Sequence, residues 1–98
     1  MGKTELISLL SMQADAVRHM GATALFLYGS RAGDTASPAS DLDLFIDYDP
    51  DSRFNALDLI GIKHLLEEKL QHDIDLTTRD GLHPRLRARI EQGAIRIF

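Results

Sequence analysis

Residues 41–49 read DLDLFIDYD, a stretch in which aspartate and apolar side chains largely alternate. Side chains of a β-strand point to opposite faces in turn, so this period of two predicts a strand over residues 42–48. The face expected to enter the core carries Leu42, Leu44, Ile46 and Tyr48. The other face is expected to be mostly carboxylate, beginning with Asp41 and Asp43.

The chain before this stretch predicts a helix and another strand. Residues 4–20 place apolar side chains at helical spacing, with Thr4 as a candidate N-cap and Gly21 suited to the left-handed conformation that ends a helix. The side chains expected in the core are Leu6, Leu10, Ala14 and Val17. Residues 23–28 form a short apolar run next to glycines, which is typical of a buried strand.

The chain after it predicts a long helix and a third strand. Ser52 is a candidate N-cap for a helix that runs to about Leu70. Its apolar side is expected to comprise Leu57, Ile60, Leu65, Leu66 and Leu70. Residues 72–78 follow as a strand that turns Ile74 and Leu76 toward the core.

The last twenty residues predict a closing helix and a short strand. His83-Pro84 suits a first helical turn, and the helix is expected to run to Gly93 with Leu86 and Ile90 inward. Residues 94–98 are a candidate last strand.

The order of these helices and strands, with the length of the chain, predicts a single α/β (α+β) domain over residues 1–98. Its small mixed sheet of three to four strands would be flanked by about four helices. The 98 residues suit one core, and 44% hydrophobic with 27% charged residues is typical of globular domains. The chain has no cysteine and no apolar run long enough for a membrane span, so we expect a cytoplasmic protein with no membrane partner.

The net charge of -4 is unevenly distributed along the chain. Residues 1–78 carry thirteen acids against six Lys and Arg, whereas residues 79–98 carry five arginines against two acids. An acidic bulk disfavours direct nucleic-acid binding and suits a divalent cation. The basic tail is either a solvated helix face or a contact for an anion.

Gly29 and Ser30 follow directly on the predicted strand at residues 23–28. A glycine lets backbone amides approach a ligand closely, and a serine hydroxyl adds a donor, so the pair could cradle phosphate oxygens. An ordinary turn is the alternative for a Gly-Ser pair at a strand end.

Two pairs of aspartates repeat the same spacing on the second and third strands. Asp41 and Asp43 lie on one strand face, close enough to bind a hard cation or flank two of them. An exposed acidic edge strand that resists aggregation is the alternative. Asp73 and Asp75 could complete a site of three carboxylates if the strands are neighbours, and Asp75 is favoured because it lies within the strand.

Two segments together resemble a known family. Residues 27–48, LYGSRAGDTASPASDLDLFIDY, resemble the Gly-Ser, Arg-Ala and Ser-Asp-x-Asp-Leu signature of the minimal nucleotidyltransferases of the DNA polymerase beta superfamily. Residues 73–90, DIDLTTRDGLHPRLRARI, resemble the third-acid strand and closing helix of that family. The resemblance implies the palm-like nucleotidyltransferase fold.

The resemblance also implies a role for each matching residue. Gly29 and Ser30, with Arg31, would hold the triphosphate of ATP. The metal ligands and catalytic residues would be Asp41, Asp43 and Asp75, the first two binding two Mg²⁺ ions. One departure is Gly33-Asp34, which stands where the family often has an Arg-Gly or similar pair after Arg-Ala. An arginine of the basic tail, or Arg31, could supply the missing cation.

The implied activity is magnesium-dependent transfer of AMP from ATP to a hydroxyl. Minimal members of the family are commonly paired with a HEPN-domain ribonuclease toxin, and some attach AMP to a tyrosine of that toxin as its antitoxin. A binding module that blocks the toxin by occlusion is a second hypothesis, and a generic interaction domain is a third. The acceptor residue, the preferred base and the oligomeric state are left open.

Overall fold

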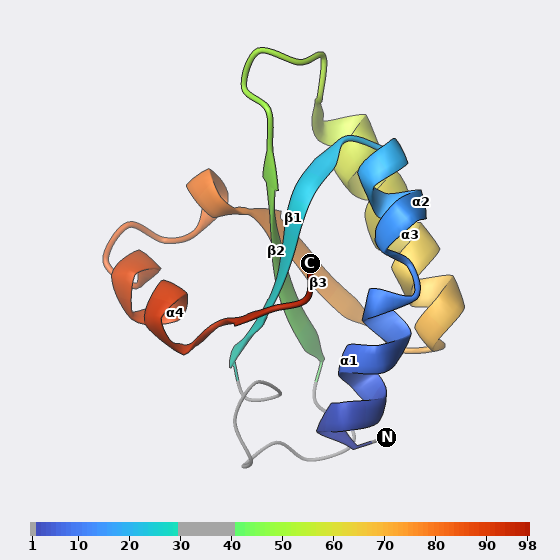
Figure 1. Cartoon of the computed structure of the whole chain (residues 1–98). Helices are drawn as coiled ribbons and strands as arrows, with labels where there is room; N and C mark the ends of the chain where they lie inside the picture. Colours follow the sequence, from blue (N-terminus) through green and yellow to red (C-terminus); the bar gives the residue numbers. More distant parts are fainter. Residues whose placement is uncertain (1, 30–40) are drawn as a thin grey trace.

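A four-stranded mixed sheet organises the chain, as predicted (Figure 1). The computed structural model describes residues 2–29 and 41–98. The strands are β1 (Ala22–Tyr28), β2 (Leu42–Tyr48), β3 (Ile74–Thr78) and β4 (Ile95–Arg96). Their order in the sheet is β3-β2-β1-β4, so β2 lies inside it. β2 pairs antiparallel with β1 and parallel with β3, and β4 pairs antiparallel with β1.

Four helices flank this sheet. They are α1 (Lys3–Ser11), α2 (Ala14–His19), α3 (Ala56–Leu70) and α4 (Arg87–Gly93), with a 3-10 turn, η2 (Arg79–Gly81), after β3. In Figure 1, α1, α2 and α3 lie together on one side of the sheet and α4 lies on the other. None of the helices formed by residues 2–29 and 41–98 is long and apolar enough to cross a membrane.

The main core lies between the sheet and the first three helices. Its fully buried side chains include Leu6, Leu10, Val17, Leu25, Leu27, Leu42, Leu44, Ile46, Ile62 and Leu66. Ile74 and Leu76 of β3 join this cluster, as their strand position predicts. The central strand was therefore oriented correctly from its alternating pattern.

The first helix breaks in two, contrary to the prediction of one helix over 4–20. α1 ends at Ser11 and α2 begins at Ala14, with Gln13 in a non-helical conformation (φ -94°, ψ 4°). The Ser11 hydroxyl donates to the carbonyl of Ile7 at 2.8 Å, a contact that competes with the helix backbone and often bends it. The predicted cap at Thr4 is also wrong, since the N-cap is Gly2. The predicted end is confirmed, because Gly21 has φ +114°.

The long helix begins later than predicted. Asn55, not Ser52, is its N-cap and forms a capping box with Asp58, whose carboxylate accepts from the Asn55 amide at 2.9 Å. Ser52 instead donates to the carbonyl of Asp49 at 2.6 Å within a turn. This start leaves Leu57 exposed at 78%, so its expected place in the core was wrong. Ile60, also predicted to face the core, is 47% exposed.

The closing segment also starts later than predicted. Its helix, α4, begins at Arg87, because the His83 carbonyl accepts from the amides of Leu86 and Arg87 in a preceding turn. Leu86 is consequently half exposed rather than inward, and Leu82 is the buried leucine of this segment. The predicted last strand is confirmed as β4.

The second face of the sheet is less acidic than the alternation predicts. Phe45, between the aspartates of β2, is fully buried and stacks on Phe26 of β1 with ring centroids 4.6 Å apart. The guanidinium of Arg79 lies over both rings, 4.8 Å from Phe26 and 5.0 Å from Phe45. An aromatic layer therefore covers the middle of this face and separates the carboxylates of Asp41 and Asp43 from those of Asp47 and Asp49.

Candidate active site

One row of residues crosses three strands at the end of the sheet where β1 stops. In the strand register, Asp43 of β2 is the Cα partner of Tyr28 on β1 and of Asp75 on β3. The three side chains share the face that carries Phe45, because side chains two residues apart on a strand point the same way. The second and third strands are thus neighbours, which was the condition for a site of three carboxylates, and their register makes Asp43 and Asp75 partners.

The electrostatics of this row centre on Asp43. Partial burial raises the pKa of the Asp43 carboxyl, and the negative charges of Asp75 and Asp41 raise it further. The pKa of the Tyr28 hydroxyl is raised in turn by burial and by the charges of Asp43 and Asp75. These carboxylates therefore repel one another, and a cation placed among them would relieve that repulsion.

Gly29 brings the backbone close against this acid. It follows β1 directly and has φ +74°, a left-handed conformation that favours glycine. A Cβ atom at this position would overlap the Oδ2 atom of Asp43 and lie 3.2 Å from its Cγ. A side chain at position 29 would therefore push the Asp43 carboxylate away from the backbone, and glycine avoids this.

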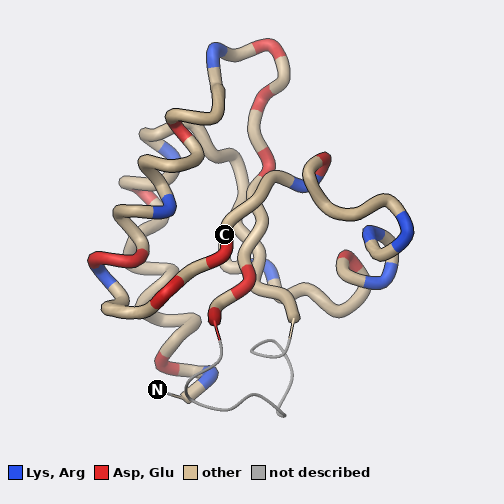
Figure 2. The backbone as a smooth tube through the Cα atoms, turned by 180° about the vertical axis from the view of Figure 1, so that it is seen from behind, with Lys and Arg blue, Asp and Glu red and all other residues tan. Residues whose placement is uncertain are grey.

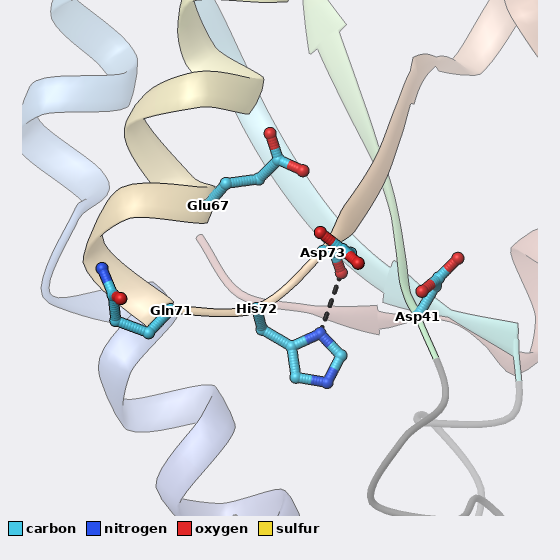
Figure 3. Close-up of a pocket in the computed structure, with 5 residues that line it drawn as sticks. All are labelled: Asp41, Glu67, Gln71, His72 and Asp73. Atoms are coloured by element: carbon cyan, nitrogen blue, oxygen red, sulfur yellow. Dashed lines mark hydrogen bonds between the residues drawn. The ribbon is translucent and has the colours of Figure 1, made fainter.

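Asp41 stands at the edge of a neighbouring open cavity of about 490 Å³. The other residues that line it are Glu67, Gln71, His72 and Asp73 (Figure 3). Asp73 lies just before β3, and its carbonyl accepts from the amide of Leu42 at 3.2 Å and lies 2.9 Å from the Nδ1 atom of His72. The cavity is acidic and adjoins the row formed by Asp43 and Asp75.

The acidic residues of β2 and β3 are close in space although far apart in sequence. Figure 2 shows red segments at the start of β2 and near the start of β3 beside one another, while the blue segments of α4 lie away from them. The side chains of these acidic residues offer carboxylate oxygens, which are the ligands that Mg²⁺ prefers. Within residues 2–29 and 41–98, no three acidic or histidine side chains are already arranged around a common point that would hold a metal ion.

Tyr28 is a residue of this row that the sequence interpretation missed. Its ring lies 5.7 Å from that of Phe45, tilted by 44°, and its backbone leads directly into Gly29. Its position two residues after Phe26 could have shown that the two side chains share a face, but the pairing of β1 with β2 is what brings Tyr28 to the acids.

Arg79 was also missed as an organising residue. Its guanidinium donates to both carboxylate oxygens of Asp47, at 2.7 and 3.0 Å, and to Glu91 of α4 at 2.8 Å. The hydrogen bond to Asp47 is the largest cause of its raised pKa. Glu91 also accepts from Arg87 at 2.9 Å. Two arginines of the basic tail are therefore bound to carboxylates of the sheet and α4.

Three parts of the predicted site lie outside the described residues. They are Ser30, Arg31 and the departure at Gly33-Asp34. The roles expected of Ser30 and Arg31 in nucleotide binding remain predictions.

A strand, a glycine turn and acidic residues on two adjoining strands are the arrangement expected of a nucleotidyltransferase. The family model described as "Nucleotidyltransferase domain" matches residues 10–97 of this chain. The chain belongs to this family and is a nucleotidyltransferase of the minimal class.

Individual relatives agree with this assignment. The chain is 31% identical over 72 residues to a candidate protein adenylyltransferase of Methanocaldococcus jannaschii, covering 74% of this chain and 75% of the relative. A solved structure of a candidate minimal nucleotidyltransferase matches with a TM-score of 0.73 and 30% identity, over 97% of this chain and 95% of that one.

A more distant match shows the fold alone. It is a chain from the solved complex of a tri-AMPylated Shewanella oneidensis HEPN toxin with an MNT antitoxin. The TM-score is 0.65 at 14% identity, over 94% of this chain and 71% of that one.

Proposed function

We propose that this nucleotidyltransferase transfers AMP from ATP, with Mg²⁺, to a hydroxyl of a partner protein, and that the acceptor is a tyrosine of a HEPN-domain toxin. The observation that carries the proposal is the register that sets Asp43 beside Asp75, with Gly29 against the Asp43 carboxylate. These groups supply what the reaction needs: oxygen ligands, a base and a close backbone approach.

Asp41, Asp43 and Asp75 are suited to hold Mg²⁺. All three are carboxylates, and the pKa of Asp43 is raised by burial and then by the negative charges of Asp75 and Asp41, which a bound cation would offset. When bound, Mg²⁺ would neutralise charge on the phosphates and lower the pKa of the attacking hydroxyl.

The chain's own residues have distinct tasks in this proposal. The backbone at Gly29, with Ser30 and Arg31, orients the triphosphate. The acceptor oxygen forms a bond to the α-phosphorus while the bond from the α-phosphorus to the bridging oxygen of pyrophosphate breaks. Asp75 is exposed at the end of its row and takes the proton of the acceptor hydroxyl.

The relatives support a protein acceptor. The Methanocaldococcus jannaschii relative is named as a candidate protein adenylyltransferase. The solved Shewanella oneidensis complex contains a HEPN toxin that carries AMP together with an MNT antitoxin.

The experiment incubates the protein with ATP, MgCl₂ and a purified candidate HEPN partner, and then measures the intact mass and modified peptides of the partner. We expect addition of AMP to a tyrosine, no addition in excess chelator, and none with Asp43→Asn. Asp49→Asn is the matched control, because Asp49 is exposed just beyond β2 and accepts from Asp51 and Ser52 within its own turn.

Two results would contradict the proposal. Unmodified partner in a stable complex would favour the alternative, an antitoxin that acts by occlusion. Equal transfer by wild type and Asp43→Asn would remove Asp43 from the site.

A further inference from the structure

Arg96 of β4 is an arginine on the active-site face that no described carboxylate neutralises. In the register of β1 and β4, it is the Cα partner of Phe26. Its guanidinium carbon lies 5.8 Å from the centroid of the Phe26 ring, which places the charged group on the same sheet face as Phe26 and Phe45. Asp43 lies on this face too, two residues before Phe45.

Arg79 lies on the same face, but its charge is neutralised by ion pairs. Arg79 also lies over Phe26, but its guanidinium is held by Asp47 and Glu91. Within residues 2–29 and 41–98, Arg96 forms no ion pair. Phe26 thus has two guanidinium groups near it, and only the charge of Arg79 is neutralised.

The charge on this face changes sign across the sheet. The side nearest β3 is acidic, with Asp43, Asp75 and the cavity that Asp41 and Asp73 line. The side nearest β4 is where Arg96 stands. An anion bound beside Asp43 is therefore attracted by the positive charge near β4 and repelled by the carboxylates near β3.

We infer that Arg96 is a substrate-positioning residue that binds the two terminal phosphates of the nucleoside triphosphate, the group that leaves as pyrophosphate. This inference rests on the proposed function, which puts the α-phosphate beside Asp43. Two strand spacings, about 10 Å, separate β4 from β2, and Arg96 is offset from the row of Asp43 by two residues, about 7 Å along β1. The extended phosphate chain and the long arginine side chain span that distance together, and a guanidinium fork suits phosphate oxygens.

The same placement of the terminal phosphates specifies from which side the acceptor hydroxyl approaches. In-line displacement puts the attacking hydroxyl opposite the leaving pyrophosphate. With pyrophosphate toward β4, the acceptor hydroxyl approaches from β3, where Asp75 is exposed and can take its proton.

The test compares binding of AMP-PNP and of AMP, each with MgCl₂, by calorimetry. Arg96→Gln should weaken AMP-PNP binding about tenfold, the effect of losing a charged hydrogen bond, and leave AMP binding unchanged. Arg96→Lys should restore part of the loss. Arg89→Gln is the matched control, since Arg89 is an exposed arginine of the same tail with no ion pair among the described residues. Thermal melts establish that each variant folds.

The outcomes separate this inference from the proposed function. If wild type binds AMP-PNP and Arg96→Gln binds it equally well, the assignment of Arg96 is wrong and the proposed function stands. If Arg96→Gln weakens AMP and AMP-PNP alike, Arg96 does not act on the terminal phosphates. If wild type binds neither nucleotide with MgCl₂, the proposed function fails, and the role of Arg96 fails with it.

Discussion

Asp43 and Asp75 are direct partners in the parallel pairing of β2 and β3. They are thirty-two positions apart in sequence, yet the charge of Asp75 contributes to the raised pKa of Asp43. A pair of like charges held at the end of a sheet opposes folding, and a bound cation reverses that opposition. Three of the predictions below concern this end of the sheet.

The stability of the protein should depend on pH through Asp43. Its folded pKa lies above the ordinary value of 3.8, so the ionised carboxylate disfavours the folded state. As pH falls through the raised folded pKa toward 3.8, the folded state takes up the proton first, and wild type should gain stability relative to Asp43→Asn. Urea unfolding of both proteins from pH 7 to pH 4 measures this difference.

At pH 7, Asp43→Asn should be as stable as wild type or more stable by up to about 1 kcal/mol. Replacing an acid of an active site often stabilises the folded protein. The gain is small because solvent screens the charge repulsion at a partly exposed carboxylate. A loss of stability at pH 7 that persists at pH 4 would show that Asp43 is a structural hydrogen-bonding residue instead.

Asp75→Asn should separate stability from ligand binding. Asp75 is exposed, so the apo variant should keep its stability to within about 1 kcal/mol. With Mg²⁺ and ATP at about 100 times the wild-type Kd, wild type should gain about 2.7 kcal/mol, and the variant less than about 1 kcal/mol. Thermal melts with and without the ligands measure both quantities.

Asp73→Asn is the control for Asp75, because Asp73 is the other candidate third acid and precedes β3. Asp73→Asn should keep the full stabilisation that Mg²⁺ and ATP confer on wild type. If Asp73→Asn loses this stabilisation and Asp75→Asn keeps it, the third acid was assigned to the wrong residue.

Gly29→Ala should lower both stability and nucleotide affinity. The left-handed φ of +74° costs an alanine about 1 to 2 kcal/mol, and its Cβ would displace the Asp43 carboxylate. Chemical unfolding and nucleotide titration measure the two effects. Gly93→Ala is the control, because a Cβ there meets no atom within 4 Å and stability should not fall. Unchanged nucleotide affinity in Gly29→Ala would contradict the close approach at this turn.

Arg79→Gln should destabilise the protein by about 1 to 3 kcal/mol, as it leaves Asp47 and Glu91 without their shared partner in a partly buried place. Arg87→Gln removes only a more exposed pair with the same Glu91 and should cost less than about 0.5 kcal/mol. Urea unfolding compares them. Equal losses for the two variants would show that Arg79 is no more than a surface ion pair.

Local patterns in the sequence were sufficient for most elements. The alternation in residues 41–49 predicted the observed bounds of β2, since a period of two can place its leucines on one buried face only as a strand. Gly21 and Gly29 marked real ends of a helix and a strand because their φ values are positive. These are properties of single residues and their nearest neighbours.

Competition between nearby groups was harder to predict. Both Ser52 and Asn55 are good caps by composition, and the capping box with Asp58 decides for Asn55. Nothing in residues 4–20 is a strong helix breaker, so the break after Ser11 depends on how its hydroxyl bonds. In each case the outcome depends on which local hydrogen bonds form, and composition alone does not specify them.

Only the tertiary structure decided which distant residues share the site. The sequence by itself determined that Asp41, Asp43 and Asp75 are acids at matching strand positions next to a glycine turn. The parallel register of β2 with β3 brings Asp43 to Asp75, and the pairing of β4 with β1 brings Arg96 to Phe26. Arg79 likewise meets Asp47, thirty-two positions away. Periodicity specifies which face a side chain takes, but strand order and register are set by burial of the whole sheet against α1, α2 and α3.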